Sequence, residues 1–527
     1  MITIGIDFGT LSARAVALDT DTGKEVAQAE YPYPHAVMDT ALPDGTPLPP
    51  LYALQHPRDY LDALAFVVGQ VLETVKKEDV AALCVDFTTA TVLPVDERGT
   101  PLCFLPEFGS EPHAYVKMWK HHGAVKQAKR FDDVARARQE PWLKNYGGTS
   151  SSEWLFPKIL ETLEEAPAVF ERTHRFYDAA DWLSRLLTGK DLCNPCMASL
   201  KAYWNSETGY PTSDYFREVD PRLETIVGTK VCPRVGRADE IAGTLHKEGS
   251  RLTGLLEGTV LTMPTGDAHA AMAAMNVVKP GSAMVVIGTS GVVLANTEEA
   301  VDVPGICGMT QGGVFPGVST VEAGQAGLGD CFDWFVKRFG LSHKELTEKA
   351  SALHPGKSRL IALDWWSGNR SILKNDNLSG LILGLNMQTR PEEIYRALIE
   401  ATAYGLRVIV ENYETHGVKI GDICAAGGIA MKNPMLMQIY ADVLGRTLTV
   451  GGSAQAGARG SAIFAAVAAG AQPDIVTAAE RYALPTTAEY RPIPAHVAVY
   501  DKLYAEYKKL HDYFGKENLV MDRLLGL

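Results

Sequence analysis

The chain has 527 residues, of which 46% are hydrophobic and 21% charged, and its formal net charge is −13. This length exceeds what one hydrophobic core supports and indicates several domains. The acidic balance argues against non-specific binding to nucleic acid, which needs basic residues to neutralise phosphates. Neither a signal peptide nor an apolar run of the roughly 20 residues that span a bilayer is evident. We therefore expect a cytoplasmic protein with no nucleic-acid or membrane partner.

The first part of the chain is predicted to open with strands. Apolar periodicity distinguishes strands from helices along this part. It predicts strands over 2–8, 13–19 and 25–31, a loop over 36–55, a helix over 58–75, a strand over 82–87, a strand pair turning at 96–99, and mostly helix over 110–260. Hairpins before the first long helix exclude a Rossmann unit, in which the first strand leads directly into a helix.

A second set of strands begins near Ala283 and repeats the opening pattern. An apolar strand over 284–287 ends in Gly288-Thr289-Ser290-Gly291, and a second strand follows. This repeat predicts two similar domains, each with one phosphate-binding turn. The rest of the chain is expected to contain a helix over 391–413, a strand over 420–426, a Gly427-Gly428 turn, a helix over 434–444 and a helical surface strap after Tyr500.

The opening turn carries the chemistry expected of a phosphate site. Asp7 ends an apolar strand and is followed by Gly9 and Thr10. Glycine lacks a Cβ, so backbone amides at Gly9 can approach an anionic ligand. Asp7 can hold Mg²⁺ directly or through water, while Thr10 and Arg14 can donate to phosphate oxygens. The alternative interpretation is an ordinary hairpin turn of an α/β domain.

Two familiar nucleotide motifs are excluded. Asp7-Phe8-Gly9 resembles the metal-binding triplet of protein kinases, but no Gly-rich loop precedes it and no His-Arg-Asp loop exists. Gly356-Lys357-Ser358 resembles the end of a P-loop, yet Ser351 occupies the position where that motif needs glycine. Any nucleotide is therefore held by another fold.

Four glycine-bearing turns are expected to project toward one site. They are Gly9-Thr10, Gly288-Thr289, Gly324 and Gly427-Gly428. Asn433 either hydrogen-bonds a base or caps the following helix. Asp267 follows a glycine and precedes an alanine-rich stretch, so it is either a helix N-cap or the base that accepts a hydroxyl proton during phosphoryl transfer.

Several segments together resemble the FGGY family of carbohydrate kinases, within the actin-like ATPase superfamily. They are Gly5 to Thr10 with Ser12 and Arg14, Val85 to Thr88, Trp119 to His122, Ser151 to Trp154, Asp267 to Ala270, Glu322 to Gln325 and Ala426 to Gly428. The resemblance runs nearly end to end. It implies an α/β fold in which two ribonuclease-H-like domains flank a deep catalytic cleft. The expected domains are residues 1–277 and 278–490, followed by a helical tail over 491–527.

The resemblance implies ATP-dependent phosphorylation of a ketopentose, with L-ribulose at its 5-hydroxyl, as in L-arabinose catabolism, as the first choice. Asp267 is then the catalytic base, and Asp7 and Asp267 are the residues expected to hold Mg²⁺. The implied sugar-binding residues are Ala90, Trp119, Lys201, Asp267 and Glu322. The implied ATP-binding residues are Gly9, Thr10, Leu11, Arg14, Gly288, Thr289, Gly324, Gly427, Gly428 and Asn433. A homodimer is compatible with this assignment.

Two alternatives stay open at this stage. Within the same family, the substrate could be xylulose or a broader range of ketopentoses. An actin-like ATPase without a sugar substrate is the remote alternative. The chain also departs from the family pattern at Ala430-Met431 and at Gly457-Ala458-Arg459-Gly460, and we expect both departures to alter adenine packing or nucleotide preference.

Overall fold

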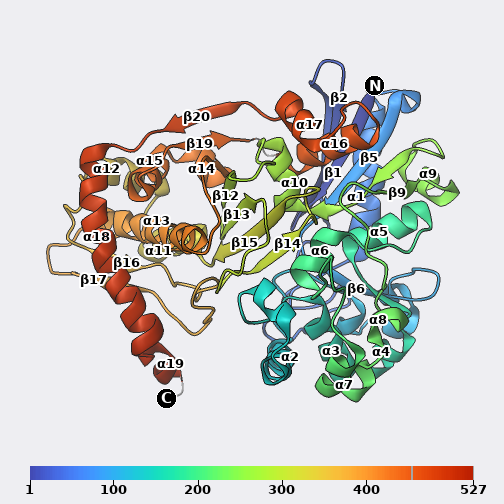
Figure 1. Ribbon diagram of the computed structural model, residues 1–527, viewed down its shortest axis with the longest axis horizontal. Coiled ribbons are helices and arrows are strands. Elements are labelled where there is room, and N and C mark those ends of the chain that lie inside the picture. Colours follow the sequence, from blue (N-terminus) through green and yellow to red (C-terminus); the bar gives the residue numbers. More distant parts are fainter. Residues whose placement is uncertain (453–454, 526–527) are drawn as a thin grey trace.

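The structure is a computed structural model that describes residues 1–452 and 455–525. It shows two sheet-rich parts side by side, with the N-terminus at the edge of one and the C-terminus below the other (Figure 1). We call residues 1–277 the N-terminal half and residues 278–525 the C-terminal half. The last two residues of the predicted tail, 526 and 527, lie outside the described residues. No helix in the described ranges is both long and apolar enough to cross a membrane.

The N-terminal half is built on a mixed sheet that begins with an antiparallel meander. In spatial order its strands are β3 (Glu25–Pro32), β2 (Ser12–Asp19), β1 (Ile2–Phe8), β5 (Val80–Phe87), β10 (Val260–Thr262) and β9 (Ile241–Thr244), and β11 (Thr265–Gly266) also pairs with β5. β1 and β5 are parallel, and Asp7 is opposite Asp86 in their register. Because parallel strands end at the same edge, these two carboxylates emerge side by side.

The C-terminal half repeats this arrangement. In spatial order its strands are β14 (Gly308–Gln311), β15 (Ser319–Gln325), β13 (Gly291–Thr297), β12 (Ala283–Ile287), β18 (Ile423–Ala426), β19 (Leu448–Gly451) and β20 (Thr486–Tyr490). β12 and β13 form a hairpin, and β12 runs parallel to β18. The predicted turns after β12 and β18 therefore lie at one edge of this sheet.

Smaller sheets and helices surround both halves. One sheet joins β4 (Leu54–Gln55), β7 (Val116–Lys117), β6 (Val92–Val95) and β8 (Arg175–Asp178), and another joins β16 (Ile361–Leu363) and β17 (Leu381–Leu383). The helices of the N-terminal half are α1 (Pro57–Leu72), α2 (Val125–Arg138), α3 (Leu155–Glu165), α4 (Pro167–Arg172), α5 (Ala179–Thr188), α6 (Pro195–Lys201), α7 (Ser213–Val219), α8 (Ile226–Thr229), α9 (Lys247–Thr253) and α10 (Asp267–Ala274). Those of the C-terminal half are α11 (Leu328–Phe339), α12 (His343–Ser351), α13 (Pro391–Thr415), α14 (Gly428–Lys432), α15 (Pro434–Leu444), α16 (Ala456–Ala468), α17 (Ile475–Tyr482), α18 (Pro494–Asp512) and α19 (Val520–Leu525).

The long helix α13 illustrates why these segments are helical. Its start is marked by Pro391 at the first helical position and by Glu393, whose carboxylate accepts a 2.8 Å hydrogen bond from the Arg390 amide. Its apolar face, which includes Leu398 and Ile409, is buried in the core of the C-terminal half. The predicted helix over 391–413 is therefore confirmed.

The helix α16 returns to the N-terminal half, where it packs against β1, β5 and α10. This packing depends on small residues. A Cβ at Gly5 would lie 1.9 Å from the carbonyl oxygen of Ala458, and one at Gly460 would lie 1.8 Å from that of Ala270. Either contact is far below van der Waals distance, so both positions require glycine for this close approach. The helix α16 belongs to the predicted 278–490 domain, and it therefore fills the core where the two halves meet.

The structure corrects three local expectations. Gly324 is not in a turn, because it lies within β15 opposite Val292. In the described residues, the turn at 96–99 does not join two paired strands. Val95 and Pro101 form only an isolated bridge, and β6 pairs with β7 and β8 instead. The predicted surface strap after Tyr500 is not confined to the surface, because α18 buries Tyr500, Tyr504 and Tyr507 in the core of the C-terminal half. The 457–460 segment lies against the N-terminal sheet, and its effect on nucleotide binding stays a prediction.

Candidate active site

Two glycine-bearing hairpin turns, one in each half, form part of the candidate site. In the first, the Gly9 amide donates to the Ser12 carbonyl at 3.0 Å, and in the second the Gly288 amide donates to the Ser290 carbonyl at 3.0 Å. A Cβ at Gly9 or Gly288 would meet only its own turn, at 3.3 and 3.5 Å, so both glycines can be approached from outside. Leu11, at the tip of the first turn, is 59% exposed. Such turns are suited to contacting phosphate oxygens through the backbone.

Three carboxyl groups gather beside the first turn. Asp7 and Asp86 are buried at the ends of β1 and β5, and Thr265 of β11 is opposite Asp86, which brings Asp267 to the same edge. Burial raises the pKa of Asp267 to about 7, and the charge of Asp7 adds to this shift. Burial also raises the pKa of Asp7, although Arg14 opposes it from 3.8 Å. The two predicted carboxylates therefore share one electrostatic environment.

The structure distinguishes the two interpretations of Asp267. Gly266 is the N-cap of α10, and Asp267 is the first helical residue. Its Oδ1 accepts a 2.7 Å hydrogen bond from the neighbouring Ala268 amide, and no side-chain cap bond forms. Asp267 is therefore not the N-cap residue of α10, although its carboxylate accepts an amide of the helix's first turn, and its role as the base stays a prediction.

The donor set beside Asp7 suits Mg²⁺. Asp7 Oδ1 and Asp86 Oδ1 are buried without a hydrogen-bond partner, and both are the carboxylate oxygens that Mg²⁺ prefers. Mg²⁺ is usually held by one or two carboxylates together with water and phosphate oxygens, and Asp7 and Asp86 are placed to supply the carboxylates. Among the described residues, no set of three acidic, histidine or cysteine side chains is arranged to hold a metal ion by itself.

Lys201 and Glu322 form an ion pair that joins the two halves. Lys201 Nζ lies 2.6 Å from Glu322 Oε1, and both side chains are nearly buried. His269 Nε2 lies 3.6 Å from the other oxygen of Glu322, and burial lowers the pKa of this histidine to about 4. Burial would raise the pKa of Glu322, but the charge and hydrogen bond of Lys201, together with other nearby cationic groups, lower it. These two predicted sugar-binding residues come together as a charged pair.

Ala90 and Trp119 are connected through one lysine. Ala90 adopts a left-handed backbone with φ of 57°, and its carbonyl accepts a 2.7 Å hydrogen bond from Lys158 Nζ. The same ammonium donates to the Met118 carbonyl at 2.9 Å, immediately before Trp119. Burial lowers the pKa of Lys158 to about 7. Trp119 itself donates from Nε1 to Thr10 Oγ1 at 3.2 Å, which ties the indole to the first turn.

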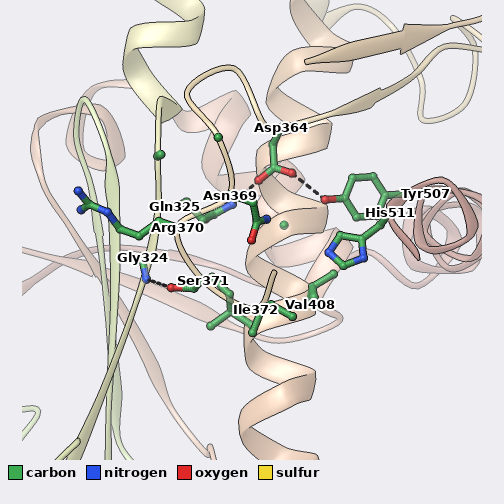
Figure 2. Close-up of a pocket in the computed structure, with 14 residues that line it drawn as sticks. Gly324, Gln325, Asp364, Asn369, Arg370, Ser371, Ile372, Val408, Tyr507 and His511 are labelled. Atoms are coloured by element: carbon green, nitrogen blue, oxygen red, sulfur yellow. Dashed lines mark hydrogen bonds between the residues drawn. The ribbon is translucent and has the colours of Figure 1, made fainter. Parts of the chain in front are cut away.

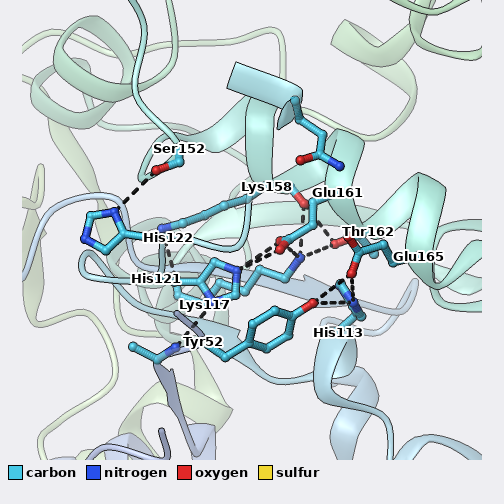
Figure 3. A network of polar contacts seen from close by, with 12 residues as sticks. Tyr52, His113, Lys117, His121, His122, Ser152, Lys158, Glu161, Thr162 and Glu165 are labelled. Carbon is cyan, nitrogen blue, oxygen red and sulfur yellow. Dashed lines mark hydrogen bonds and ion pairs between the residues drawn. The ribbon is translucent and has the colours of Figure 1, made fainter. Parts of the chain in front are cut away.

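A buried polar network lies next to the segment that carries Trp119 (Figure 3). Lys117 Nζ lies 2.5 Å from Glu161 Oε2, and His121 Nε2 lies 3.0 Å from the same oxygen. Burial would raise the pKa of Glu161, but the nearby Lys117 ammonium lowers it. Because β7 ends at Lys117, this network holds the chain two residues before Trp119. The network supports the indole and is itself buried.

The Gly427-Gly428 turn lies beside the second phosphate-type turn. Gly427 has φ of 99°, and a Cβ there would lie 2.5 Å from the Ile287 carbonyl oxygen. Glycine is therefore required at this position. A Cβ at Gly428 would have no neighbour within 4 Å, so the space beside this residue is open. Asn433 accepts from the Leu436 amide at 3.1 Å, so it caps α15, which is one of its two predicted roles.

Several residues of the site were not predicted from the sequence. Asp86 was noted only as part of a family motif, and it accepts a 2.6 Å hydrogen bond from Ser461 of α16. A Cβ at Gly457 would lie 2.9 Å from Asp7 Cγ, so α16 also lines the first carboxylate. The Gly-x-x-Gly-Ser spacing at 457–461 was a signal for close helix packing. No local pattern marks Lys158.

Two sheet-rich halves, each with a glycine-bearing hairpin turn, give the two-domain α/β architecture that the resemblance implies. The model of the N-terminal domain of the FGGY family of carbohydrate kinases matches residues 2–274, and that of its C-terminal domain matches residues 283–469. The chain belongs to this family. It is 44% identical to a ribulokinase of Bacillus licheniformis, covering 98% of this chain and 97% of that protein. It is 43% identical to a ribulokinase of Mycolicibacterium smegmatis, covering 99% and 95%.

Solved structures share the fold. A xylulose kinase from Rhodospirillum rubrum superimposes with a TM-score of 0.82 at 23% identity, covering 98% of this chain and 99% of that one. Plasmodium falciparum glycerol kinase with ADP superimposes with a TM-score of 0.77 at 16% identity, covering 97% and 98%. The family and the α/β fold with two sheet-rich domains that the sequence predicted are thus confirmed.

Proposed function

We propose that this protein transfers the terminal phosphoryl group of ATP to a ketopentose, with L-ribulose and its 5-hydroxyl as the preferred acceptor. One observation carries the proposal. Asp267 follows β11 at the sheet edge where Asp7 ends β1, and two residues later His269 lies 3.6 Å from Glu322 of the predicted sugar pocket. A base at this position can serve a sugar hydroxyl and a phosphoryl group together. The naming of full-length relatives as ribulokinases supports L-ribulose.

Asp267 is proposed to accept the proton of the attacking hydroxyl. A pKa of about 7 leaves a substantial fraction of this carboxylate ionised at neutral pH while keeping it basic enough to take a proton. The charges of Lys201 and Glu322 are already paired, so their remaining donor and acceptor positions can bind neutral sugar hydroxyls. The indole of Trp119 offers an apolar face for the C–H surface of the sugar.

The backbone amides of the Gly9 and Gly288 turns are proposed to contact the phosphates from the two halves. Asp7 would hold Mg²⁺, supported by Asp86 and assisted by Asp267, and the ion would neutralise phosphate charge when bound. Closure of the halves on the substrates would exclude water, which would otherwise compete as the acceptor. The cytoplasmic location and the homodimer stay predictions from the sequence.

A substrate panel tests the proposal. The protein is incubated with ATP, Mg²⁺ and, separately, L-ribulose, D-ribulose, L-xylulose and D-xylulose, and ADP release is coupled to NADH oxidation. We expect the highest kcat/KM with L-ribulose, because the full-length relatives of this chain are named ribulokinases. Preference for a xylulose would favour the related pentulose kinase activity. ATP hydrolysis that none of the sugars changes would refute a carbohydrate substrate.

A further inference from the structure

The segment between β16 and β17 carries a cation from the C-terminal half into the N-terminal half. Arg370 Nη2 donates to Glu153 Oε1 at 2.7 Å, and these side chains are 27% and 16% exposed. Glu153 lies just before α3, in the N-terminal half. Figure 2 shows the Arg370 side chain directed away from Tyr507 and His511, which lie on the other side of the small pocket behind this segment.

Arg370 lies between two predicted sugar-binding residues. Its guanidinium carbon is 5.9 Å from the centroid of the Trp119 ring. Its stem also packs against Gly324, two residues after Glu322 on the same strand, β15, and its positive charge contributes to lowering the pKa of Glu322. Trp119 belongs to the N-terminal half and Glu322 to the C-terminal half. Arg370 therefore borders the candidate sugar site at the point where the halves meet.

The backbone around Arg370 is held from both sides. The Gly324 amide donates to Ser371 Oγ at 2.7 Å, and a Cβ at Gly324 would lie 2.9 Å from Arg370 Cδ. Gly324 thus leaves room for the arginine stem. Lys374 Nζ donates to the Tyr146 carbonyl of the N-terminal half at 2.8 Å. A side chain held in this way loses little conformational entropy when it binds a ligand.

We propose that Arg370 is a further sugar-binding residue, which donates hydrogen bonds to a hydroxyl or carbonyl oxygen of the ketopentose, and that Glu153 orients its guanidinium. This inference rests on the proposed function. A guanidinium has five N–H donors, so pairing with one carboxylate leaves others for a ligand. Because Glu153 compensates its charge, Arg370 suits a neutral polyol better than a polyphosphate.

The test compares Arg370→Met and Arg370→Lys with the wild-type protein. The matched control is Arg338→Met, since Arg338 is an exposed arginine of α11. For each protein the KM for L-ribulose, the KM for ATP and kcat are measured, and L-ribulose binding without ATP is measured by calorimetry. We expect Arg370→Met to raise the KM and Kd for L-ribulose about tenfold, with the KM for ATP within about twofold of wild type. Arg370→Lys should be intermediate, because it keeps the charge but not the planar fork.

Glu153→Gln is the second variant, and it should weaken L-ribulose binding in the same direction. If thermal unfolding shows that Arg370→Met does not fold, Glu153→Gln and Arg370→Lys are the variants that test the proposal. Unchanged L-ribulose constants in folded variants would overturn the role of Arg370 and leave the proposed function intact. A rise confined to the KM for ATP would overturn it too. If the wild-type protein phosphorylates none of the ketopentoses, the proposed function fails, and the calorimetric Kd still decides the role of Arg370.

Discussion

The two hairpin turns follow the first strand of each half but differ in length and in the groups around them. In the N-terminal half, Asp7 stands two residues before Gly9, and Arg14 and Glu30 flank it. In the C-terminal half, Val286 stands two residues before Gly288, and the turn carbonyls of Gly288 and Thr289 accept amides from the start of α11. The strand before the first turn therefore ends with a buried carboxylate, whereas the strand before the second turn ends with apolar residues. The fold repeats a glycine-bearing turn, and the buried carboxylate distinguishes the first turn from the second.

The largest effect is expected from Asp267→Asn. Asparagine keeps the size of the side chain but cannot accept the hydroxyl proton, so kcat should fall by at least ~10², the low end of what a general base supplies. The KM for L-ribulose should change little. Steady-state kinetics with the four ketopentoses checks both. Near-normal turnover would remove Asp267 from the role of base and would weaken the contrast between the two turns.

The next effect is expected from Asp7→Asn, which removes the charge that distinguishes the first turn. We expect kcat to fall about 10- to 100-fold and the Mg²⁺ concentration for half-maximal activity to rise. Mn²⁺ binding to the protein with a nucleotide, followed by electron paramagnetic resonance, supplies a readout that does not depend on turnover. Unchanged Mn²⁺ affinity would show that the carboxylate of the first turn does not hold the ion.

A smaller effect should come from the second turn. Gly427→Ala forces a left-handed backbone and a 2.5 Å contact with the Ile287 carbonyl, which lies directly before Gly288. We expect a loss of about 1–3 kcal/mol of stability, together with a higher KM for ATP and an unchanged KM for the sugar. Gly428→Ala is the matched control, because its Cβ enters open space. Equal melting temperatures for the two variants would contradict this account.

The smallest effect concerns the pH dependence of stability. Asp267 has a pKa of about 7 in the folded protein, above its ordinary value of 3.8. The folded state therefore binds its proton more tightly, and the associated stability is present at low pH and is lost as pH rises through 7. An asparagine side chain does not ionise, so Asp267→Asn should melt roughly 2 °C or more above wild type at pH 8, and the gap should close toward pH 4. The exposed Asp422→Asn serves as the control, and an equal gap at both pH values would contradict a raised pKa.

Local patterns in the sequence predicted much of the fold. β1, β5, β12, α13 and α15 lie where apolar periodicity and glycine or proline punctuation indicate them. The helical tail is also present, although α18 buries Tyr500, Tyr504 and Tyr507 in the core of the C-terminal half. Gly324 was assigned to a turn because glycine is common there. The reason for glycine is instead the stem of Arg370, a residue far along the chain, and no local pattern contains that information.

The sequence by itself determined the strand-to-turn units at Asp7 and Gly288, because each depends on residues adjacent along the chain, and it determined the family, because short local motifs recur along the whole chain; the candidate base stays a prediction from that family pattern. Only the tertiary structure decided that α16 packs on β1, that Asp86 joins Asp7, and that Arg370 reaches Glu153 across the two halves. These contacts join segments up to hundreds of residues apart. They form because buried small residues and compensated charges fit one another only after both sheets have folded.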